Sequence, residues 1–101
     1  MDDQRQVRAF IETHDLDAPA AFRLLDLVSE VGELAKDVNE STAYGTTPET
    51  LDISTDELGD VLFALLALCE TCDVDAGDAL AVSLEKYERR LETAEDPSSG
   101  T

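Results

Sequence analysis

Two short segments of the chain repeat one pattern of acidic residues around a glycine. They read Glu30-Val31-Gly32-Glu33-Leu34 and Glu57-Leu58-Gly59-Asp60-Val61. Acids three residues apart project from nearly the same side of a helix, one turn apart, so each segment would present a pair of carboxylates. Two such pairs on facing helices would form an all-oxygen site, which suits Mg²⁺ or Mn²⁺. Because Mg²⁺ commonly joins protein carboxylates to substrate phosphates, the pattern favours phosphate chemistry.

The chain has few cations that could neutralise these acids in place of a metal. Each pair lies among apolar residues, and a carboxylate that faces a core is costly unless it is paired. Arg23 and Lys36 are the only basic residues on the first of the two helices, and the second helix has none. A mid-helix glycine costs about 1 kcal/mol relative to alanine, so one in each pair indicates close approach of two backbones or of a ligand. We therefore expect a divalent metal ion to bind the four acids, Glu30, Glu33, Glu57 and Asp60.

The same acids also have a simpler structural interpretation. Ser54 to Glu57 has the form of a helix-capping box, in which Glu57 would serve the helix end. With 24 acids in 101 residues, an E-x-x-[ED] pattern also arises easily by chance, and its members would then be solvated. A di-iron bundle is disfavoured, because that class needs Glu-x-x-His pairs and the one histidine, His14, is in none.

Composition limits the possible partners and location. Seven Lys and Arg against 24 Asp and Glu give a formal net charge of −17, which repels nucleic acid and anionic membranes. The acids are spread along the whole chain, which favours a halophilic protein, since molar salt shortens the screening length to about 3 Å. The polar N-terminus has no signal-peptide pattern. The apolar run from Val61 to Cys69 is far shorter than the roughly 20 residues of a membrane span. We expect a cytoplasmic protein without nucleic-acid or membrane partners.

Cys69 and Cys72 form a C-x-x-C, a spacing found in redox and zinc sites. A structural zinc site usually needs four protein ligands, and the chain has no second cysteine pair. Redox pairs follow a strand, whereas this pair ends a helical pattern. We interpret both as small apolar residues near a helix end.

Apolar periodicity predicts helices throughout and no strand. The expected helices cover residues 3–14, 20–39, 54–71 and 76–95. A Thr- and Ser-rich loop over residues 41–53 separates the second from the third, and loops of this length are often functional. The elements predict an all-α four-helix bundle.

The chain is long enough for one domain, which we place at residues 1–95, with a disordered tail over 96–101. The third helix is apolar nearly all round between Val61 and Cys69. Such a helix must be buried on most sides, and one short chain can hardly cover it. We therefore expect oligomerisation to complete the bundle.

Four stretches of the chain resemble the MazG-like nucleotide pyrophosphohydrolases, in order over about residues 20–91. They are Leu27–Lys36, Ser41–Gly45, Asp56–Leu66 and Glu85–Arg90. The resemblance implies an all-α pyrophosphohydrolase fold, a homodimer or homotetramer, with Mg²⁺ held by the four acids. It implies hydrolysis of a nucleoside triphosphate to monophosphate and pyrophosphate, a reaction compatible with nucleotide-pool house-cleaning. It also implies that three basic residues touch phosphate, namely Lys86, Arg89 and Arg90.

In the implied reaction, Mg²⁺ or Mn²⁺ neutralises phosphate charge and acidifies a water, and Glu30 or Glu33 accepts the proton of that water. Ser29 departs from the family, which often has a second Glu there, and weaker metal binding would follow. The three cations could instead balance neighbouring acids on a solvated face. Two other functions stay open: phosphoribosyl-ATP pyrophosphohydrolase, and a metal- and nucleotide-binding regulatory module without turnover.

Overall fold

The computed structural model describes residues 2–93, and the regular structure of these residues is entirely helical. The α-helices are α1 (Asp2–Thr13), α2 (Ala20–Ser41), α3 (Thr55–Thr71) and α4 (Ala76–Glu92), with a 3₁₀ turn, η1 (Pro48–Thr50), between α2 and α3. The predicted all-α fold is therefore confirmed. The tail predicted over residues 96–101 lies outside the described part of the chain.

Short polar side chains set the start of two helices. Ser54 is the N-cap of α3, and its hydroxyl accepts a hydrogen bond from the Glu57 backbone N–H at 3.1 Å. Asp75 caps α4 in the same way, with its carboxylate accepting from the Asp78 N–H at 2.9 Å. Each cap satisfies a backbone donor that has no partner within its helix. The cap predicted at Ser54 is therefore present.

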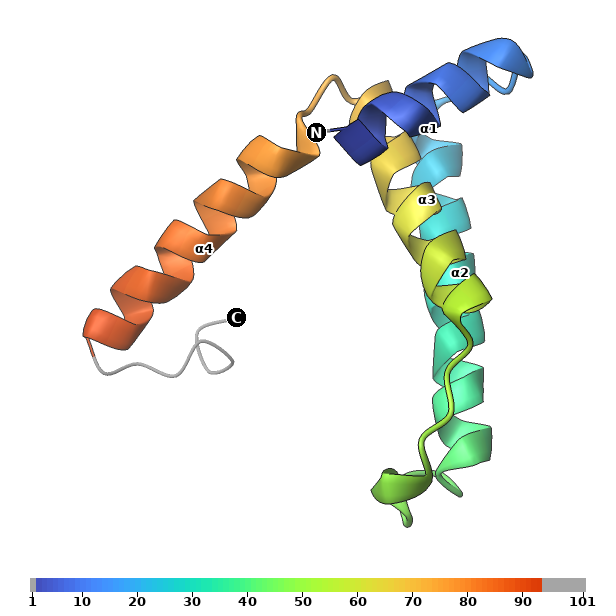
Figure 1. Ribbon diagram of the computed structural model, residues 1–101, viewed down its shortest axis with the longest axis vertical. Helices are drawn as coiled ribbons and strands as arrows, with labels where there is room; N and C mark the ends of the chain where they lie inside the picture. Colours follow the sequence, from blue (N-terminus) through green and yellow to red (C-terminus); the bar gives the residue numbers. More distant parts are fainter. Residues whose placement is uncertain (1, 94–101) are drawn as a thin grey trace.

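Helices α2 and α3 form an antiparallel hairpin, which Figure 1 shows running the length of the molecule. The turn after α2 is held by the buried Thr42, whose hydroxyl accepts a hydrogen bond from the Gly45 N–H at 3.0 Å. Ala43, Tyr44 and Gly45 all have positive φ, which reverses the chain direction within a few residues. The reversal lets α3 return along α2, so the two acidic segments come side by side.

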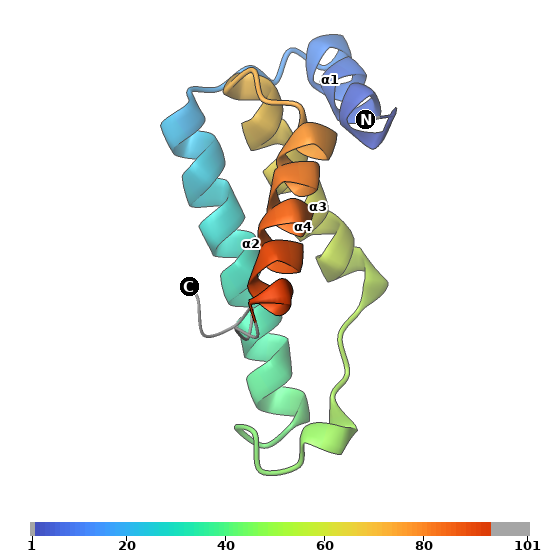
Figure 2. The same cartoon turned by 90° about the vertical axis from the view of Figure 1, so that its left-hand side faces the viewer.

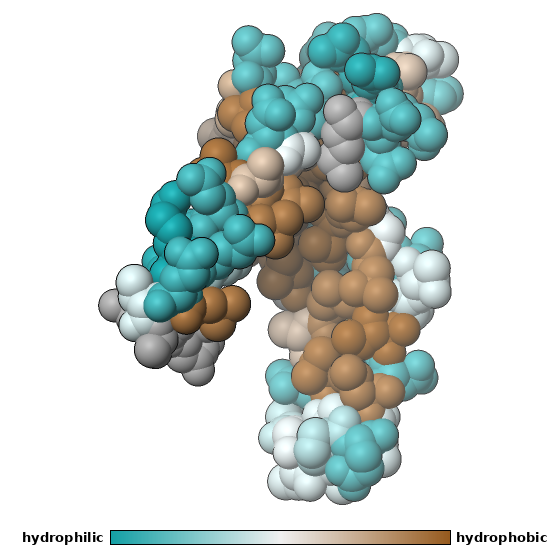
Figure 3. Space-filling view, turned by 60° about the vertical axis from the view of Figure 1, so that its left-hand side comes forward, coloured by the Kyte–Doolittle hydropathy of each residue, from teal (hydrophilic) through white to brown (hydrophobic). Residues whose placement is uncertain are grey.

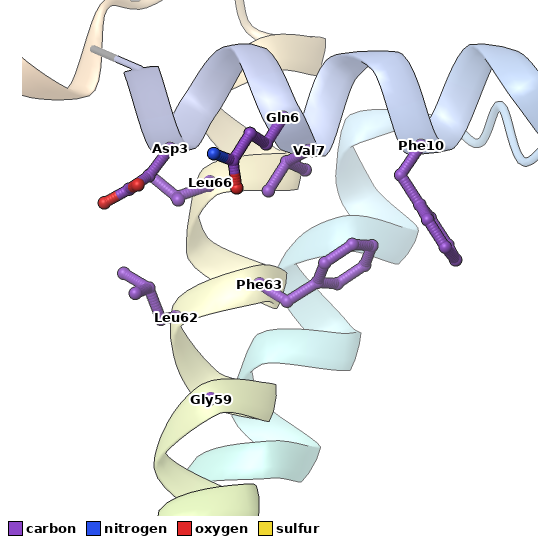
Figure 4. Close-up of a pocket in the computed structure, with 8 residues that line it drawn as sticks. All are labelled: Asp3, Gln6, Val7, Phe10, Gly59, Leu62, Phe63 and Leu66. Atoms are coloured by element: carbon purple, nitrogen blue, oxygen red, sulfur yellow. The ribbon is translucent and has the colours of Figure 1, made fainter.

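Helix α1 crosses α3 at the end of the hairpin away from this turn, as Figures 1 and 2 both show. Val7 and Ile11 of α1 pack with Leu66 and Ala67 of α3, and these residues form the small buried core. An apolar pocket of about 490 Å³ lies beneath α1, and Figure 4 shows Leu62 among its lining residues. The core is therefore at one end of the hairpin and leaves the rest of it uncovered.

Helix α4 diverges from the hairpin after a short turn and makes only sparse contacts with the other elements. Its apolar residues Leu80, Leu84 and Leu91 are consequently exposed. The four predicted helices are present, but a single chain holds them as an open arrangement in which α4 stands apart. None of the helices within residues 2–93 is long and apolar enough to cross a membrane.

Candidate active site

The antiparallel hairpin brings the two acidic segments together in matched pairs. Glu30 of α2 and Asp60 of α3 line one pocket of about 390 Å³ between the helices. Glu33 of α2 is close enough to Glu57 of α3 for charge repulsion to raise the pKa of Glu57. The first acid of each segment therefore faces the second acid of the other segment. This arrangement follows because α2 and α3 run in opposite directions. Where the two segments lie beside each other, the order of the acids on one helix is reversed relative to the other.

Glu57 has a strongly altered pKa, which is raised from its ordinary value of 4.5 to about 7. The largest cause is a hydrogen bond with the Asp37 side chain, followed by burial and by repulsion from Asp37, Glu33 and Asp56. Its Oε2 atom is shielded from solvent and has no hydrogen-bond donor within residues 2–93. If Glu57 and Asp37 are both ionised, neither carries a proton that could form a hydrogen bond between them. The Glu57 Oε2 atom is then stabilised only by a proton or by a bound cation.

Asp37 is a site residue that the acidic pattern did not reveal. It lies four residues after Glu33 on α2, half-buried against α3 and beside Glu57. It also lines a neighbouring pocket that includes Ser54, the N-cap of α3. Helical spacing could have indicated this residue, because Asp37 lies one turn beyond Glu33. It shares with Leu34 the side of α2 that faces α3.

The four acids of the two segments supply carboxylate oxygens, which are suitable ligands for a divalent cation. Carboxylate oxygens are the preferred ligands of Mg²⁺ and Mn²⁺, and the Glu57 Oε2 atom lacks a partner. Within residues 2–93, no three His, Cys, Asp or Glu side chains lie close enough together to hold a metal ion as they are placed. The acids thus lie as two pairs along the interface, and binding would need side-chain rotation to converge them.

Arg23 adds a positive charge to the pocket that Glu30 and Asp60 line. It is only 8% exposed, and one of its Nη atoms donates a hydrogen bond to the Leu16 carbonyl. Its Nε atom is buried without a partner among the described residues. A buried guanidinium next to carboxylates offsets part of their charge. Arg23 is thus a second residue of the pocket that the acidic pattern did not reveal.

The three predicted phosphate contacts lie on α4, and Figure 1 shows that this helix stands apart from the hairpin whose segments carry the acids. Arg89 pairs with Glu85 at 2.8 Å. Lys86 and Arg90 lie over the Tyr87 ring, at 5.0 and 5.7 Å from its centroid. One chain does not bring these cations to the acidic pairs, and their role toward phosphate stays a prediction.

The glycines of the two segments are not required by packing within one chain. A Cβ atom added at Gly32 or Gly59 would meet nothing within 4 Å. The expected close approach of two backbones at these positions is therefore wrong for the single chain. Space at both positions remains for a ligand or another molecule.

Cys69 and Cys72 are both free thiols. Cys69 is half-buried in α3, and burial raises the pKa of its thiol. Cys72 is exposed at the C-cap of the same helix. A raised thiol pKa opposes the thiolate form that redox chemistry requires.

The sequence matches the MazG nucleotide pyrophosphohydrolase domain over residues 22–94. The chain therefore belongs to the MazG nucleotide pyrophosphohydrolase domain family, as the resemblance implied. The match takes in α2 from Phe22 onward, α3, α4 and all four predicted metal ligands, whereas α1 lies before it. No curated protein and no solved structure gave a match.

Proposed function

We propose that the protein is a metal-dependent nucleoside triphosphate pyrophosphohydrolase, which releases a nucleoside monophosphate and pyrophosphate. The observation that carries the proposal is the pairing of acids across the hairpin, with Glu30 beside Asp60 in one pocket and Glu33 near Glu57. Membership of a nucleotide pyrophosphohydrolase domain family supports the reaction class.

The metal ligands in this proposal are Glu30, Glu33, Glu57 and Asp60. The unpartnered Glu57 Oε2 atom supports a cation at this place, because a buried carboxylate oxygen is costly without one. When bound, Mg²⁺ or Mn²⁺ neutralises phosphate charge and lowers the pKa of a water. Asp37, beside Glu57, adds negative charge that strengthens the attraction for the cation.

Proton acceptance from the attacking water falls to the α2 pair. Glu30 is half-buried in the pocket, and Glu33 is exposed beside it. Either carboxylate can act as general base if the water comes within hydrogen-bonding distance of it. Arg23, at the same pocket, holds positive charge where the triphosphate would lie, and a guanidinium suits phosphate.

Pyrophosphate release tests the proposal. The protein is incubated with Mg²⁺ or Mn²⁺ in molar KCl with a panel of ribo- and deoxyribonucleoside triphosphates and phosphoribosyl-ATP. We expect monophosphate and pyrophosphate from at least one of them, and loss of both products in Glu57→Gln. The matched control is Glu49→Gln, which neutralises an acid exposed in η1. Unchanged turnover in Glu57→Gln would overturn the assignment.

A metal- and nucleotide-binding regulatory module without turnover is the second candidate. Two observations favour it, the serine at position 29 and the absence of a three-ligand cluster within residues 2–93. Calorimetric binding of a triphosphate with Mg²⁺, together with no product from any nucleotide, would select this module over the enzyme.

A further inference from the structure

Cys69 and Cys72 occupy two defined positions in the backbone motif that ends α3. Asp73 has a positive φ of 56°, and its N–H donates to the Glu70 carbonyl at 3.2 Å. The Val74 N–H donates to the Cys69 carbonyl at 2.9 Å. These two bonds form a Schellman motif, in which Cys72 is the C-cap of the helix. Cys69 lies three residues earlier, on the same side of the helix, so both thiols belong to one turn.

Packing accounts for Cys69 but not for Cys72. Cys69 is half-buried, whereas Cys72 is exposed, and an exposed thiol buries little apolar surface. Burial raises the pKa of the Cys69 thiol, and charge on the neighbouring Cys72 sulfur raises that pKa further. The second effect requires the two sulfur atoms to be close. An accessible thiol thus lies beside a protected one, which is the arrangement of redox-sensing cysteines that have a resolving partner.

We propose that Cys69 and Cys72 are a modification site, at which a small disulfide oxidises the two thiols to an intrachain disulfide. The Cys72 thiolate attacks one sulfur of the small disulfide, which forms a mixed disulfide and releases the first small thiolate. The Cys69 thiolate then attacks the Cys72 sulfur and releases the second. Each protein thiol gives its proton to solvent, and each released thiolate takes one back. Two protein thiols are oxidised, and one small disulfide is reduced to two thiols.

The environments of the two thiols assign the order of the two steps. Cys72 meets the oxidant first, because its side chain is the exposed one. Burial keeps most of the Cys69 thiol protonated, which makes it a poor first nucleophile. A small thiolate fraction is enough for the second step, because the mixed disulfide is held beside the attacking sulfur.

Negative charge around the pair restricts the class of oxidant. Glu70, Asp73 and Asp75 all lie within three residues of Cys72, in a chain of net charge −17. Figure 3 shows that the end of the molecule formed by α1, which packs on this part of α3, has a largely hydrophilic surface. Such a surface repels an anionic disulfide. The co-reactant is therefore a neutral or cationic disulfide.

Closure of the disulfide requires the last turn of α3 to tighten. Side chains three residues apart on a helix have Cβ atoms about 5–6 Å apart, whereas a disulfide needs about 3.5–4.5 Å. The tightening acts on the Val74 N–H, which bonds to the Cys69 carbonyl. Gln4 of α1 holds the same turn, since its Nε2 donates to the Val74 carbonyl at 2.8 Å and its Oε1 accepts from the Ala76 N–H at 2.7 Å. Oxidation should therefore loosen the turn between α3 and α4.

Mass spectrometry of the full chain tests the modification without nucleotide, so its outcome is independent of the proposed function. The reduced protein in molar KCl is treated with cystamine, a cationic disulfide, and quenched with acid. We expect the chain to lose the mass of two hydrogen atoms, to keep no adduct and to have no thiol that reacts with iodoacetamide. Dithiothreitol should restore both thiols. A lasting adduct, a disulfide between chains or two unreacted thiols overturns the proposal.

Single variants test the order of attack. Cys69→Ala should keep one half of cystamine on Cys72, because no second thiol remains to displace it. Cys72→Ala should stay largely unmodified, because its one thiol is half-buried. The matched control, Cys69→Ala/Cys72→Ala, should gain no mass. Equal adducts in the two single variants would contradict the assigned order.

The charge of the oxidant provides another comparison. Cystamine should react faster than anionic glutathione disulfide at the lowest KCl concentration that leaves helicity unchanged. The difference should narrow in molar KCl, where charges are screened. Equal rates for the two disulfides at low salt would remove the restriction to neutral or cationic oxidants.

Amide hydrogen exchange measures the effect on the turn. The Ala76 N–H should exchange roughly tenfold or more faster in the oxidised protein, because its bond to Gln4 is weakened. The Leu66 N–H, in the buried part of α3, is the control and should be unchanged. Equal Ala76 exchange in the reduced and the oxidised protein would overturn the link between the disulfide and the turn.

Discussion

The carboxylates of Asp37 and Glu57 face each other across the α2–α3 interface, and this proximity is the largest cause of the raised Glu57 pKa. The two residues come from segments twenty positions apart, and only the hairpin brings them together. Two neighbouring carboxylates repel each other when both are ionised, and a proton or a cation between them removes this repulsion. The pair therefore links the proposed metal site to measurable effects of pH.

Without metal, the contribution of Glu57 to stability should decrease as pH rises. Its pKa is about 7 in the folded protein against 4.5 ordinarily, so the folded state binds the proton more tightly. The contribution is complete below pH 4.5 and is lost as pH rises through about 7. Urea unfolding in EDTA and molar KCl, from pH 4 to 8, measures it. Asp37→Asn should flatten this part of the profile, and an identical profile in that variant would contradict the pairing.

Loss of one proposed ligand should abolish turnover without unfolding the helices. Asp60→Asn keeps the size of an exposed side chain and removes its charge, so far-UV circular dichroism should stay unchanged. We expect kcat/KM to fall by roughly 100-fold or more, since even indirect partners of a metal are worth 10–100-fold. Manganese affinity, followed by electron paramagnetic resonance, should fall in parallel. Normal Mn²⁺ affinity in Asp60→Asn would remove this residue from the site.

Loss of the hydrogen bonds that hold the α3–α4 turn should lower stability. Gln4→Ala leaves the Val74 carbonyl and the Ala76 N–H without their partner, which costs about 1–3 kcal/mol when the groups stay buried. Thermal melts followed by circular dichroism should therefore show a melting temperature lower by roughly 4–8 °C for each kcal/mol lost. Gln6→Ala, an exposed neighbour on α1, is the control and should behave as the unaltered chain.

Low salt should destabilise the protein through repulsion between its acids. The formal net charge of −17 is screened over about 3 Å in molar salt and over about 30 Å at 0.01 M. Each kcal/mol lost lowers the melting temperature of a domain of this size by roughly 4–8 °C. Thermal melts in 0.01 M and 2 M KCl measure the difference. Equal melting temperatures would contradict adaptation to high salt.

Local patterns were enough to predict the helices and the two acidic segments that face each other across the hairpin. Ser54 caps α3 as its sequence indicated, because capping depends on residues within one turn. The pairing of Glu30 with Asp60 follows from two similar segments on antiparallel helices. These features depend on spacing, which the sequence displays directly.

Features that depend on contacts between distant residues escaped prediction. Asp37 looks like any other acid until the side of α2 that faces α3 is known. The direction of α4 depends on Gln4, which bonds to residues about seventy positions away. Within one chain the glycines of the two segments do not bring two backbones together, and the approach of a ligand at these positions stays a prediction.

The distance between the cations of α4 and the acids of the hairpin has a consequence for mixtures of defective proteins. If oligomerisation brings them together, each catalytic centre draws its acids from one chain and its cations from another. Asp60→Asn mixed with an Arg89→Ala/Arg90→Ala variant would then regain activity, because a mixed dimer has one intact centre. Random pairing would restore roughly a quarter of all centres, whereas chains that work independently would restore none.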